Sequence, residues 1–376
     1  MAITICVVRE TVPGERRVAL TPDVAKKLKA KSASLLIERG AGNAASFPDA
    51  SYKDTEVADD ARSALARTDV LLTVQPPSLD EIAGLKEGAV TIGYLQPHLA
   101  PERIKALRDR KITSFAMELL PRTTRAQAMD VLSSQANIAG YKAVVLAANE
   151  YGKFMPMLMT AAGTVKAARV LILGVGVAGL QAIATAKRLG AVIEASDVRP
   201  SVKDQVESLG GKWVDVPYET DEEKQIAEGV GGYARPMPPA WMARQAGIIA
   251  ERCKLVDILI TTALIPGRPA PKLIKADVVA TMKPGAVIVD LAVEQGGNVE
   301  GSEPGRVVEK NGVKIVGTTN LPALVAADAS ALYARNVLNF LALSLNPKSG
   351  DFALARDDEI VKATLVCDNG QVVPRG

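Results

Sequence analysis

A glycine-rich turn between an apolar strand and a helix is the feature that most constrains the fold of this chain. The apolar run Arg169–Leu173 leads into Gly174, Gly176 and Gly179, which follow the spacing G-x-G-x-x-G, and residues 180–189 have a helical pattern. The first glycine permits a tight turn, the second lets a pyrophosphate approach the backbone, and the third lets the helix pack closely on the strand. The free N–H groups and the positive dipole end of the helix would then face the phosphates.

An acidic residue follows the second strand of this pattern. The apolar run Val192–Ser196 ends at Asp197, at the distance expected for the carboxylate that hydrogen-bonds the adenosine ribose. Strand, glycines, helix, strand and acid in this order predict a dinucleotide site, whereas the glycines alone would also fit a tight turn that binds nothing. The Asp197 carboxylate should repel the 2′-phosphate of NADP, although Arg199, two residues further on, is of the type that can accept that phosphate. We therefore expect NAD(H) to be the preferred dinucleotide.

Length and composition indicate a globular protein of two domains. The chain has 376 residues, of which 48% are hydrophobic, and its formal net charge is only +3, so nothing points to nucleic acid. The three cysteines, Cys6, Cys253 and Cys367, are far apart, which suits a reducing cytoplasm and argues against a disulfide framework or a zinc site. No apolar run reaches about 18 residues and the N-terminal run is short, so we expect neither a membrane span nor a signal peptide.

The alternation of apolar strands and helical patterns predicts an α/β fold with two Rossmann-like, doubly wound parallel-sheet domains. Strands of the first domain are expected at residues 3–8, 35–38, 70–74, 90–95 and 113–116. Strands of the second domain are expected at residues 169–173, 192–196, 212–216, 258–261, 286–290 and 314–316. Long helices over residues 130–153 and 326–345 would join the domains, with the dinucleotide cleft between them. We therefore predict a first domain of residues 1–135 plus 326–376 and an NAD(H)-binding Rossmann domain of residues 136–325.

Two segments depart from this alternation. Residues 352–374 predict a hairpin-like appendage after the last long helix. Residues 217–239 predict a long loop, acidic at first and then rich in glycine and proline, and loops of this length are often lids or binding loops. Gly231 and Gly232 would give such a lid its hinge freedom beside Tyr233, while a solvated surface excursion is the alternative.

A polar stretch before the first long helix is a second candidate site. Arg122, Gln127, Asp130 and Ser133 bring a guanidinium, an amide, a carboxylate and a hydroxyl into one loop and helix start. In a purely structural interpretation, Asp130 caps the helix and the arginine is solvated. In a functional one, Arg122 meets a phosphate or carboxamide while the other three hold a nicotinamide and its ribose. The pattern by itself leaves both interpretations open.

Five motifs together make the chain resemble the NAD(H)-binding component, often called domain I, of the proton-translocating nicotinamide nucleotide transhydrogenases. The resemblance covers essentially the whole chain, and each motif is longer and more particular than a glycine fingerprint. The motifs lie at residues 121–141, 160–164, 231–234, 261–267 and 289–297. The resemblance implies catalytic roles for Gln127 and Asp130. It also places further residues at the cofactor, namely Val177, Ala178, Val198, Arg199, Gly232, Tyr233, Gln245 and Leu264.

The resemblance also implies what such a subunit does and with which partners. It would be a soluble subunit that binds NAD(H) and exchanges hydride directly with NADP(H) held by a partner subunit. A homodimer is implied, as is a partner that supplies the NADP(H)-binding and membrane-spanning domains. Proton translocation would belong to that complex, with this chain cytoplasmic and peripheral to the inner (plasma) membrane through its partners.

Alanine dehydrogenases share some of the same pattern and supply the alternative function. They carry a lysine where this chain has Gln75, and a histidine where it has Gln96 or, with a two-residue gap, His98, which is the single histidine of the chain. Reducing a keto or imino group requires a proton donor, whereas passing hydride between two nicotinamide rings changes no protonation on either ring. The second reaction needs alignment and exclusion of water, which suits a site without lysine or histidine. A non-catalytic NAD sensor is a third alternative.

Overall fold

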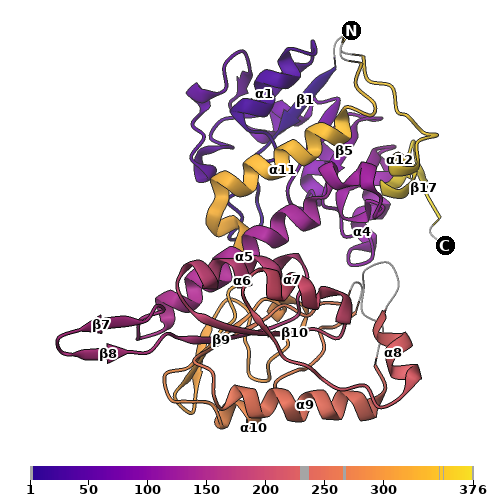
Figure 1. Cartoon of the computed structure of the whole chain (residues 1–376). Coiled ribbons are helices and arrows are strands. Elements are labelled where there is room, and N and C mark those ends of the chain that lie inside the picture. The colour runs from indigo at the N-terminus through magenta and orange to yellow at the C-terminus, as the bar shows by residue number, and fades with distance from the viewer. Residues whose placement is uncertain (1–2, 229–236, 266–267, 347, 350, 375–376) are drawn as a thin grey trace. The chain divides into compact units, whose positions relative to one another are not determined.

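The computed structural model describes residues 3–228, 237–265, 268–346, 348–349 and 351–374 (Figure 1). The chain divides into two compact units, residues 1–135 with 322–376 and residues 136–321. Each unit has a mostly parallel sheet with helices, so the predicted α/β class with two Rossmann-like domains is confirmed. Within these ranges, no helix is both long and apolar enough to cross a membrane.

The first unit is built on a sheet with the strand order β17-β16-β6-β5-β4-β1-β2-β3, in which β1 to β6 run parallel. Its strands are β1 (Thr4–Val7), β2 (Ser34–Glu38), β3 (Glu56–Ala58), β4 (Val70–Leu72), β5 (Val90–Gly93), β6 (Thr113–Ala116), β16 (Leu365–Asp368) and β17 (Gln371–Val372). Its helices are α1 (Pro22–Lys29), α2 (Ala61–Leu65), α3 (Leu79–Gly84), α4 (Pro101–Asp109), α11 (Ala326–Leu341), α12 (Glu359–Thr364) and the start of α5 (Val131–Glu150).

Helices cover both faces of this sheet because its strands are apolar on both sides. Side chains of a strand point alternately to the two faces. Ile5 and Val7 of β1 accordingly join a buried cluster that includes side chains of α1 and α11. Cys6 joins a second buried cluster with side chains of α2, α3 and α4. The unit is therefore doubly wound around a sheet that is buried on both faces.

The C-terminal segment belongs to this sheet, so the prediction of an appendage at residues 352–374 was only partly right. β16 and β17 do form a hairpin, but β16 also pairs antiparallel with β6, where Leu365 lies opposite Phe115. Val366 and Cys367 are buried against the helices of the second cluster. The local pattern showed the hairpin, whereas the pairing with a strand about 250 residues earlier depends on tertiary structure that no local pattern carries.

The second unit is built on a sheet with the strand order β11-β10-β9-β12-β13-β15-β14, which is parallel except for β14 at one edge. Its strands are β9 (Arg169–Leu173), β10 (Val192–Ser196), β11 (Lys212–Trp213), β12 (Ile258–Thr261), β13 (Val287–Asp290), β14 (Val307–Lys310) and β15 (Val313–Val316). Its helices, besides the end of α5, are α6 (Val177–Arg188), α7 (Lys203–Ser208), α8 (Asp221–Glu228), α9 (Pro239–Cys253) and α10 (Ala276–Ala280).

This strand order creates a point at which the direction of winding reverses. The chain goes from β9 outward to β10 and β11, and then returns to place β12 on the other side of β9. In open α/β sheets, ligands bind at the carboxyl ends of the strands beside such a reversal. The topology therefore directs attention to the residues that follow β9, β10 and β12.

The predicted loop at residues 217–239 contains a helix, so that prediction was wrong for its first half. Residues 221–228 form α8, and the Thr220 Oγ1 atom accepts a hydrogen bond from the backbone N–H of Glu223 at 3.1 Å. The acidic run that suggested a solvated loop is the first turn of this helix, where carboxylates are favoured by the helix dipole. Gly231, Gly232 and Tyr233, on which the lid prediction depends, lie outside the described residues.

A two-stranded hairpin of the second unit, β7 (Leu158–Thr160) with β8 (Gly163–Val165), was not anticipated. Every residue of both strands is exposed, and Figure 1 shows the hairpin projecting from its own unit. Apolar side chains are exposed on it and just before it, with Met159 71% exposed, Met157 61% and Phe154 56%. An isolated hairpin of this kind is marginally stable by itself.

Candidate dinucleotide site

The turn after β9 requires glycine at its first position. Gly174 has a φ of +91°, in the left-handed region that side chains rarely adopt. A Cβ atom at Gly174 would also lie 2.6 Å from the Oγ1 atom of Thr262. That hydroxyl donates a hydrogen bond to the Gly174 carbonyl oxygen at 2.9 Å. The residue that follows β12 therefore fixes the turn that follows β9.

The other two glycines of the fingerprint differ in what surrounds them. A Cβ atom at Gly179 would lie 2.0 Å from the Gly174 carbonyl oxygen, so α6 packs directly on the turn. Gly140 of α5 makes a similar approach, because its Cβ would lie 2.0 Å from the Ala178 carbonyl oxygen. A Cβ atom at Gly176, in contrast, would have nothing within 4 Å. Among the described residues, Gly176 alone of the three thus borders open space, where a ligand could approach the backbone.

The N-terminus of α6 lies at this opening. Gly176 precedes the helix, and no side chain caps it. The first N–H groups of a helix have no partner within the helix, and the helix dipole adds positive potential there. Val177 is 38% exposed and Ala178 is also exposed to solvent, so both predicted contacts border the opening. This is the arrangement by which helix N-termini bind phosphate groups.

Asp197, which follows β10, is already hydrogen-bonded within the chain. Its Oδ2 atom accepts from the backbone N–H of Val175 at 2.7 Å and from Nη2 of Arg199 at 2.8 Å. Its Oδ1 atom accepts from the backbone N–H and the Nε of Arg199 at 2.9 and 2.8 Å. These hydrogen bonds from Asp197 raise the pKa of the Arg199 guanidinium. The structure therefore pairs the two residues that the sequence suggested as separate contacts.

A second layer of polar residues supports the ends of β12 and β13, and sequence reasoning did not assign it to the site. The fully buried Asn298 accepts from the backbone N–H of Ala263 at 3.0 Å and donates to the carbonyl oxygens of Ala263 and Pro271. The buried Asp290 accepts from three backbone N–H groups, including that of Asn298 at 3.2 Å. A Cβ atom at Gly297 would lie 2.6 Å from Asp290, so the glycine pair after β13 was the available sequence signal.

The remaining predicted residues of the second unit occupy different elements. Val198 packs on a cluster that contains Trp241 of α9, and its carbonyl oxygen accepts a hydrogen bond from the hydroxyl of Tyr218 at 3.4 Å. Leu264, after β12, is 44% exposed. Gln245 is partly buried on α9. The structure thus gathers the predicted residues that follow β9, β10 and β12 at one end of the sheet.

The polar stretch of the first unit lies in a 3₁₀ turn, η4 (Thr124–Met129), and the start of α5. Asp130 caps α5, because its carboxylate accepts from the backbone N–H of Ser133 at 2.9 Å and from the Ser133 hydroxyl at 2.5 Å. Gln127 is exposed and Arg122 is exposed or nearly so. The structural interpretation of Asp130 is therefore realised, and its carboxylate is held in one orientation beside an exposed amide.

A buried polar network occupies the position at which the alanine dehydrogenases carry their lysine. Arg17 is 4% exposed and binds the Glu15 carboxylate with two hydrogen bonds, at 2.8 and 2.7 Å. Gln75 donates to the same carboxylate at 2.7 Å, and Gln135 accepts from Arg17 at 2.8 Å. Burial raises the pKa of Glu15, but the hydrogen bonds and charge of Arg17 outweigh it and leave that pKa lowered to about 2. His98 is exposed.

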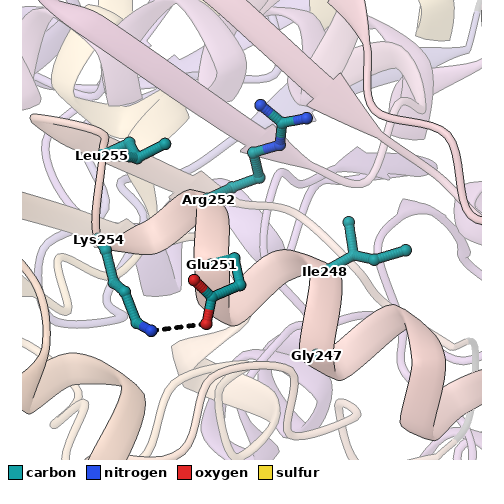
Figure 2. Close-up of a pocket in the computed structure, with 6 residues that line it drawn as sticks. All are labelled: Gly247, Ile248, Glu251, Arg252, Lys254 and Leu255. Atoms are coloured by element: carbon teal, nitrogen blue, oxygen red, sulfur yellow. Dashed lines mark hydrogen bonds and ion pairs between the residues drawn. The ribbon is translucent and has the colours of Figure 1, made fainter.

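A separate open cavity, of about 410 Å³, is lined by the last turns of α9 and the residues after it (Figure 2). Glu251 and Lys254 form an ion pair at 2.6 Å on its wall. The lining residues are Gly247, Ile248, Glu251, Arg252, Lys254 and Leu255. None of the predicted site residues is among them, so this cavity is distinct from the glycine turn.

Comparison with known proteins gives a consistent family. The family model for the alanine dehydrogenase/PNT N-terminal domain matches residues 6–139, and that for the C-terminal domain matches residues 143–375. An NAD(P) transhydrogenase alpha subunit of Rhodospirillum rubrum is 50% identical, over 98% of this chain and 97% of that protein. The crystal structure of transhydrogenase from Sinorhizobium meliloti has a TM-score of 0.88 and 47% identity, over 98% of this chain and 100% of that one.

The alanine dehydrogenases are more distant relatives. A solved L-alanine dehydrogenase has a TM-score of 0.78 and 26% identity, over 99% of this chain and 97% of that one. The higher identity extends along the whole length of the transhydrogenase subunits, so it does not reflect one shared motif. The chain therefore belongs to the alanine dehydrogenase/PNT family and, within it, to the NAD(P) transhydrogenase alpha subunits.

Proposed function

We propose that this chain is the NAD(H)-binding subunit of a proton-translocating transhydrogenase and that it exchanges hydride directly with NADP(H) on a partner subunit. The observation that carries the proposal is the 50% identity to an NAD(P) transhydrogenase alpha subunit over nearly the full length of both chains. The open backbone at Gly176, before an uncapped helix N-terminus, supports a pyrophosphate contact there. Bound NADH would supply the hydride.

The polar stretch of the first unit is proposed to hold the nicotinamide end of the same dinucleotide. Gln127 is exposed and carries an amide with two donors and an acceptor, which can pair with a carboxamide. Asp130 is oriented by Ser133, so its carboxylate can accept from a ribose hydroxyl without reorganising. Arg122 would contact a phosphate or the carboxamide. In this role, Gln127 and Asp130 align the ring and exclude water, and they move no proton.

The residues that a keto-acid reductase would need are differently arranged in this chain. Gln75, at the position of the lysine, donates to Glu15 within a closed network, and an amide cannot donate a proton at neutral pH. The only histidine of the sequence, His98, is exposed and is not a member of that network. These two residues favour hydride exchange between nicotinamides over reduction of a carbonyl or imine.

The alternative is an alanine dehydrogenase-like enzyme, which the 26% identical solved structure keeps in view. Pyruvate, ammonium and NADH together discriminate between the two functions. We expect no NADH oxidation in that mixture, because the network around Glu15 offers no proton donor to the keto group. Turnover at a rate typical of enzymes would replace the proposed function with this one.

We further propose that the chain acts as a homodimer within a larger complex. The exposed hairpin β7–β8 with Met157 and Met159 is an apolar surface of the kind that a second copy of a chain covers. The partner subunits would carry the NADP(H) site and the membrane-spanning, proton-moving domains. The complex would hold this chain at the cytoplasmic face of the inner (plasma) membrane.

A single-turnover experiment tests the central proposal. The chain is loaded with NADH and mixed in a stopped-flow instrument with the NADP⁺-loaded partner subunit, and absorbance follows the nucleotides. Transfer with deuterium-labelled NADH should deliver the label to NADPH without exchange with water, because the hydride passes directly. Label lost to water, or no transfer at all, would contradict direct hydride exchange.

A further inference from the structure

The turn that carries Gln127 is packed against α11 on its inner side. Ala126 and Met129 of this turn are 1% and 6% exposed, and both belong to the buried cluster that contains Val337 and Phe340 of α11. Gln127 lies between them in sequence and is exposed. The alternation of buried and exposed residues within one short turn means that α11 sets the position from which the Gln127 amide extends.

Two asparagines of α11 converge on one backbone atom of the turn. The Nδ2 atoms of Asn336 and Asn339 each donate to the Ala128 carbonyl oxygen at 2.9 Å. A carbonyl oxygen has two lone pairs, so both of its acceptor sites are filled. The preceding carbonyl, that of Gln127, accepts from the backbone N–H of Asp130 at 3.2 Å. Because peptide planes are rigid, these contacts fix the backbone on the C-terminal side of Gln127 and leave only its side-chain torsions free.

Asn336 is an unfavourable residue for packing alone. It is 8% exposed, and its Oδ1 atom is buried without a hydrogen-bond partner among the residues that the structure describes. Leaving a buried acceptor unpaired costs free energy, and an apolar side chain of similar size would avoid that cost. The amide at this position therefore indicates a requirement for its donor, which is directed at Ala128.

A third contact holds the other side of the same turn. Nη2 of Arg125 contacts both carboxylate oxygens of Asp358, the residue that caps α12. The Asp358 side chain is 17% exposed, which partly shields the pair from solvent. Contacts from α11 and α12 thus bracket Gln127 at residues 125 and 128.

We propose that Asn336 and Asn339 are positioning residues, which hold the turn so that the Gln127 amide meets the nicotinamide. The inference rests on the proposed function, because it assigns their effect to hydride transfer through Gln127. They contact neither substrate nor cofactor, and they act through the Ala128 carbonyl oxygen. Misplacing a group that aligns the reacting atoms by as little as about 1 Å can lower a rate by up to about 100-fold.

The test compares three variants of the full chain in complex with the NADP⁺-loaded partner subunit. Asn336→Leu/Asn339→Ala removes both donors and also removes the unpaired oxygen, so we expect the melting temperature to stay close to that of the wild type. Gln127→Ala removes the amide itself. Asn149→Ala is the matched control, because Asn149 is an exposed asparagine of α5 that donates to the neighbouring Glu150. Single-turnover hydride transfer, NADH affinity by calorimetry and the order parameter of a labelled Ala128 methyl group are measured for each.

The double variant should slow hydride transfer by about tenfold or more while NADH affinity changes by less than about threefold. Its Ala128 methyl order parameter should fall, and the control should match the wild type throughout. An unchanged order parameter would overturn the inference whatever the rates are. Unchanged hydride transfer in the double variant, with slow transfer in Gln127→Ala, would overturn the inference and leave the proposed function standing. Unchanged transfer in Gln127→Ala would remove Gln127 from the site, and the positioning role with it.

Discussion

Asp197 and Arg199 satisfy each other at the end of β10. Arg199 donates three hydrogen bonds to the Asp197 carboxylate, and the backbone N–H of Val175 donates a fourth. A carboxylate offers about four lone-pair sites, so a ribose hydroxyl that binds Asp197 has to take the place of one donor. A 2′-phosphate, in turn, would meet a paired arginine beside a carboxylate.

This pairing predicts a preference for NADH over NADPH. The Asp197 carboxylate repels the 2′-phosphate, and its partner Arg199 is already neutralised, so the wild type should favour NADH by ~1.4 kcal/mol or more, which is at least about tenfold. Asp197→Asn should narrow that ratio, because it removes the repulsion and releases the arginine. Calorimetric titration with both nucleotides measures the ratio. Asp204→Asn, an exposed carboxylate of α7, is the control that should keep the wild-type ratio. Equal affinities in the wild type would exclude Asp197 as the selective residue.

The glycines predict a separation of stability from binding by one type of substitution. Gly176→Ala places a methyl group in open space at a φ of −80°, which alanine adopts readily. Its melting temperature should therefore stay near that of the wild type, while NADH affinity falls about tenfold or more because the methyl group faces the pyrophosphate. Gly179→Ala instead forces a contact 2.0 Å from the Gly174 carbonyl oxygen and should destabilise the fold by about 1–3 kcal/mol. Thermal unfolding and calorimetry separate the two effects, and a stable, tightly binding Gly176→Ala would contradict the pyrophosphate contact.

Sequence alone could predict the elements whose signals are local. The apolar run of β9, the turn glycines Gly174 and Gly179 and the strand before Asp197 lie within 29 residues of one another, and each has its own steric reason. Residues that act across the sheet could not be found in this way. Thr262 fixes the Gly174 turn from 88 positions away, and Asn298 supports β12 from the strand beyond it. Their roles depend on strand order, which no local pattern carries.

The missed elements share a different physical reason. The hairpin β7–β8 is exposed on both strands, so it lacks the alternation of buried and exposed residues that marks a strand. The helix α8 begins with three acidic residues, which composition suggests are solvated and which the helix dipole in fact stabilises. In the polar stretch, the sequence could name Gln127 and Asp130, but the contacts from Asn336 and Asn339 come from a helix about 200 residues later.

The Glu15–Arg17 pair predicts a loss of stability in acid. The pKa of Glu15 is lowered from 4.5 to about 2 in the folded chain, so its contribution is fully present above pH 4.5 and is lost as the pH falls toward 2. The shift corresponds to about 3 kcal/mol in that window. Urea unfolding at stepwise pH values measures it against Glu15→Gln/Arg17→Met, which removes both charges and should flatten the curve. Glu56→Gln, which breaks an exposed ion pair with Arg67, should keep the wild-type slope. Equal slopes in the wild type and the double variant would contradict the assignment.

The exposed hairpin predicts how the homodimer can be broken. Met157→Asp/Met159→Asp places two carboxylates on side chains that are 61% and 71% exposed, so the folding of the chain itself should be little affected. A dimer that covers these side chains would have to bury two unpaired charges in each copy, which is strongly unfavourable. Sedimentation velocity should therefore show a dimer for the wild type and a monomer for this variant, with an unchanged melting profile at the level of secondary structure. Leu99→Asp is the matched control, because Leu99 is 78% exposed in the other unit and should leave the dimer intact. A variant that stays dimeric would place the interface elsewhere, and a wild type that sediments as a monomer would contradict the dimer itself.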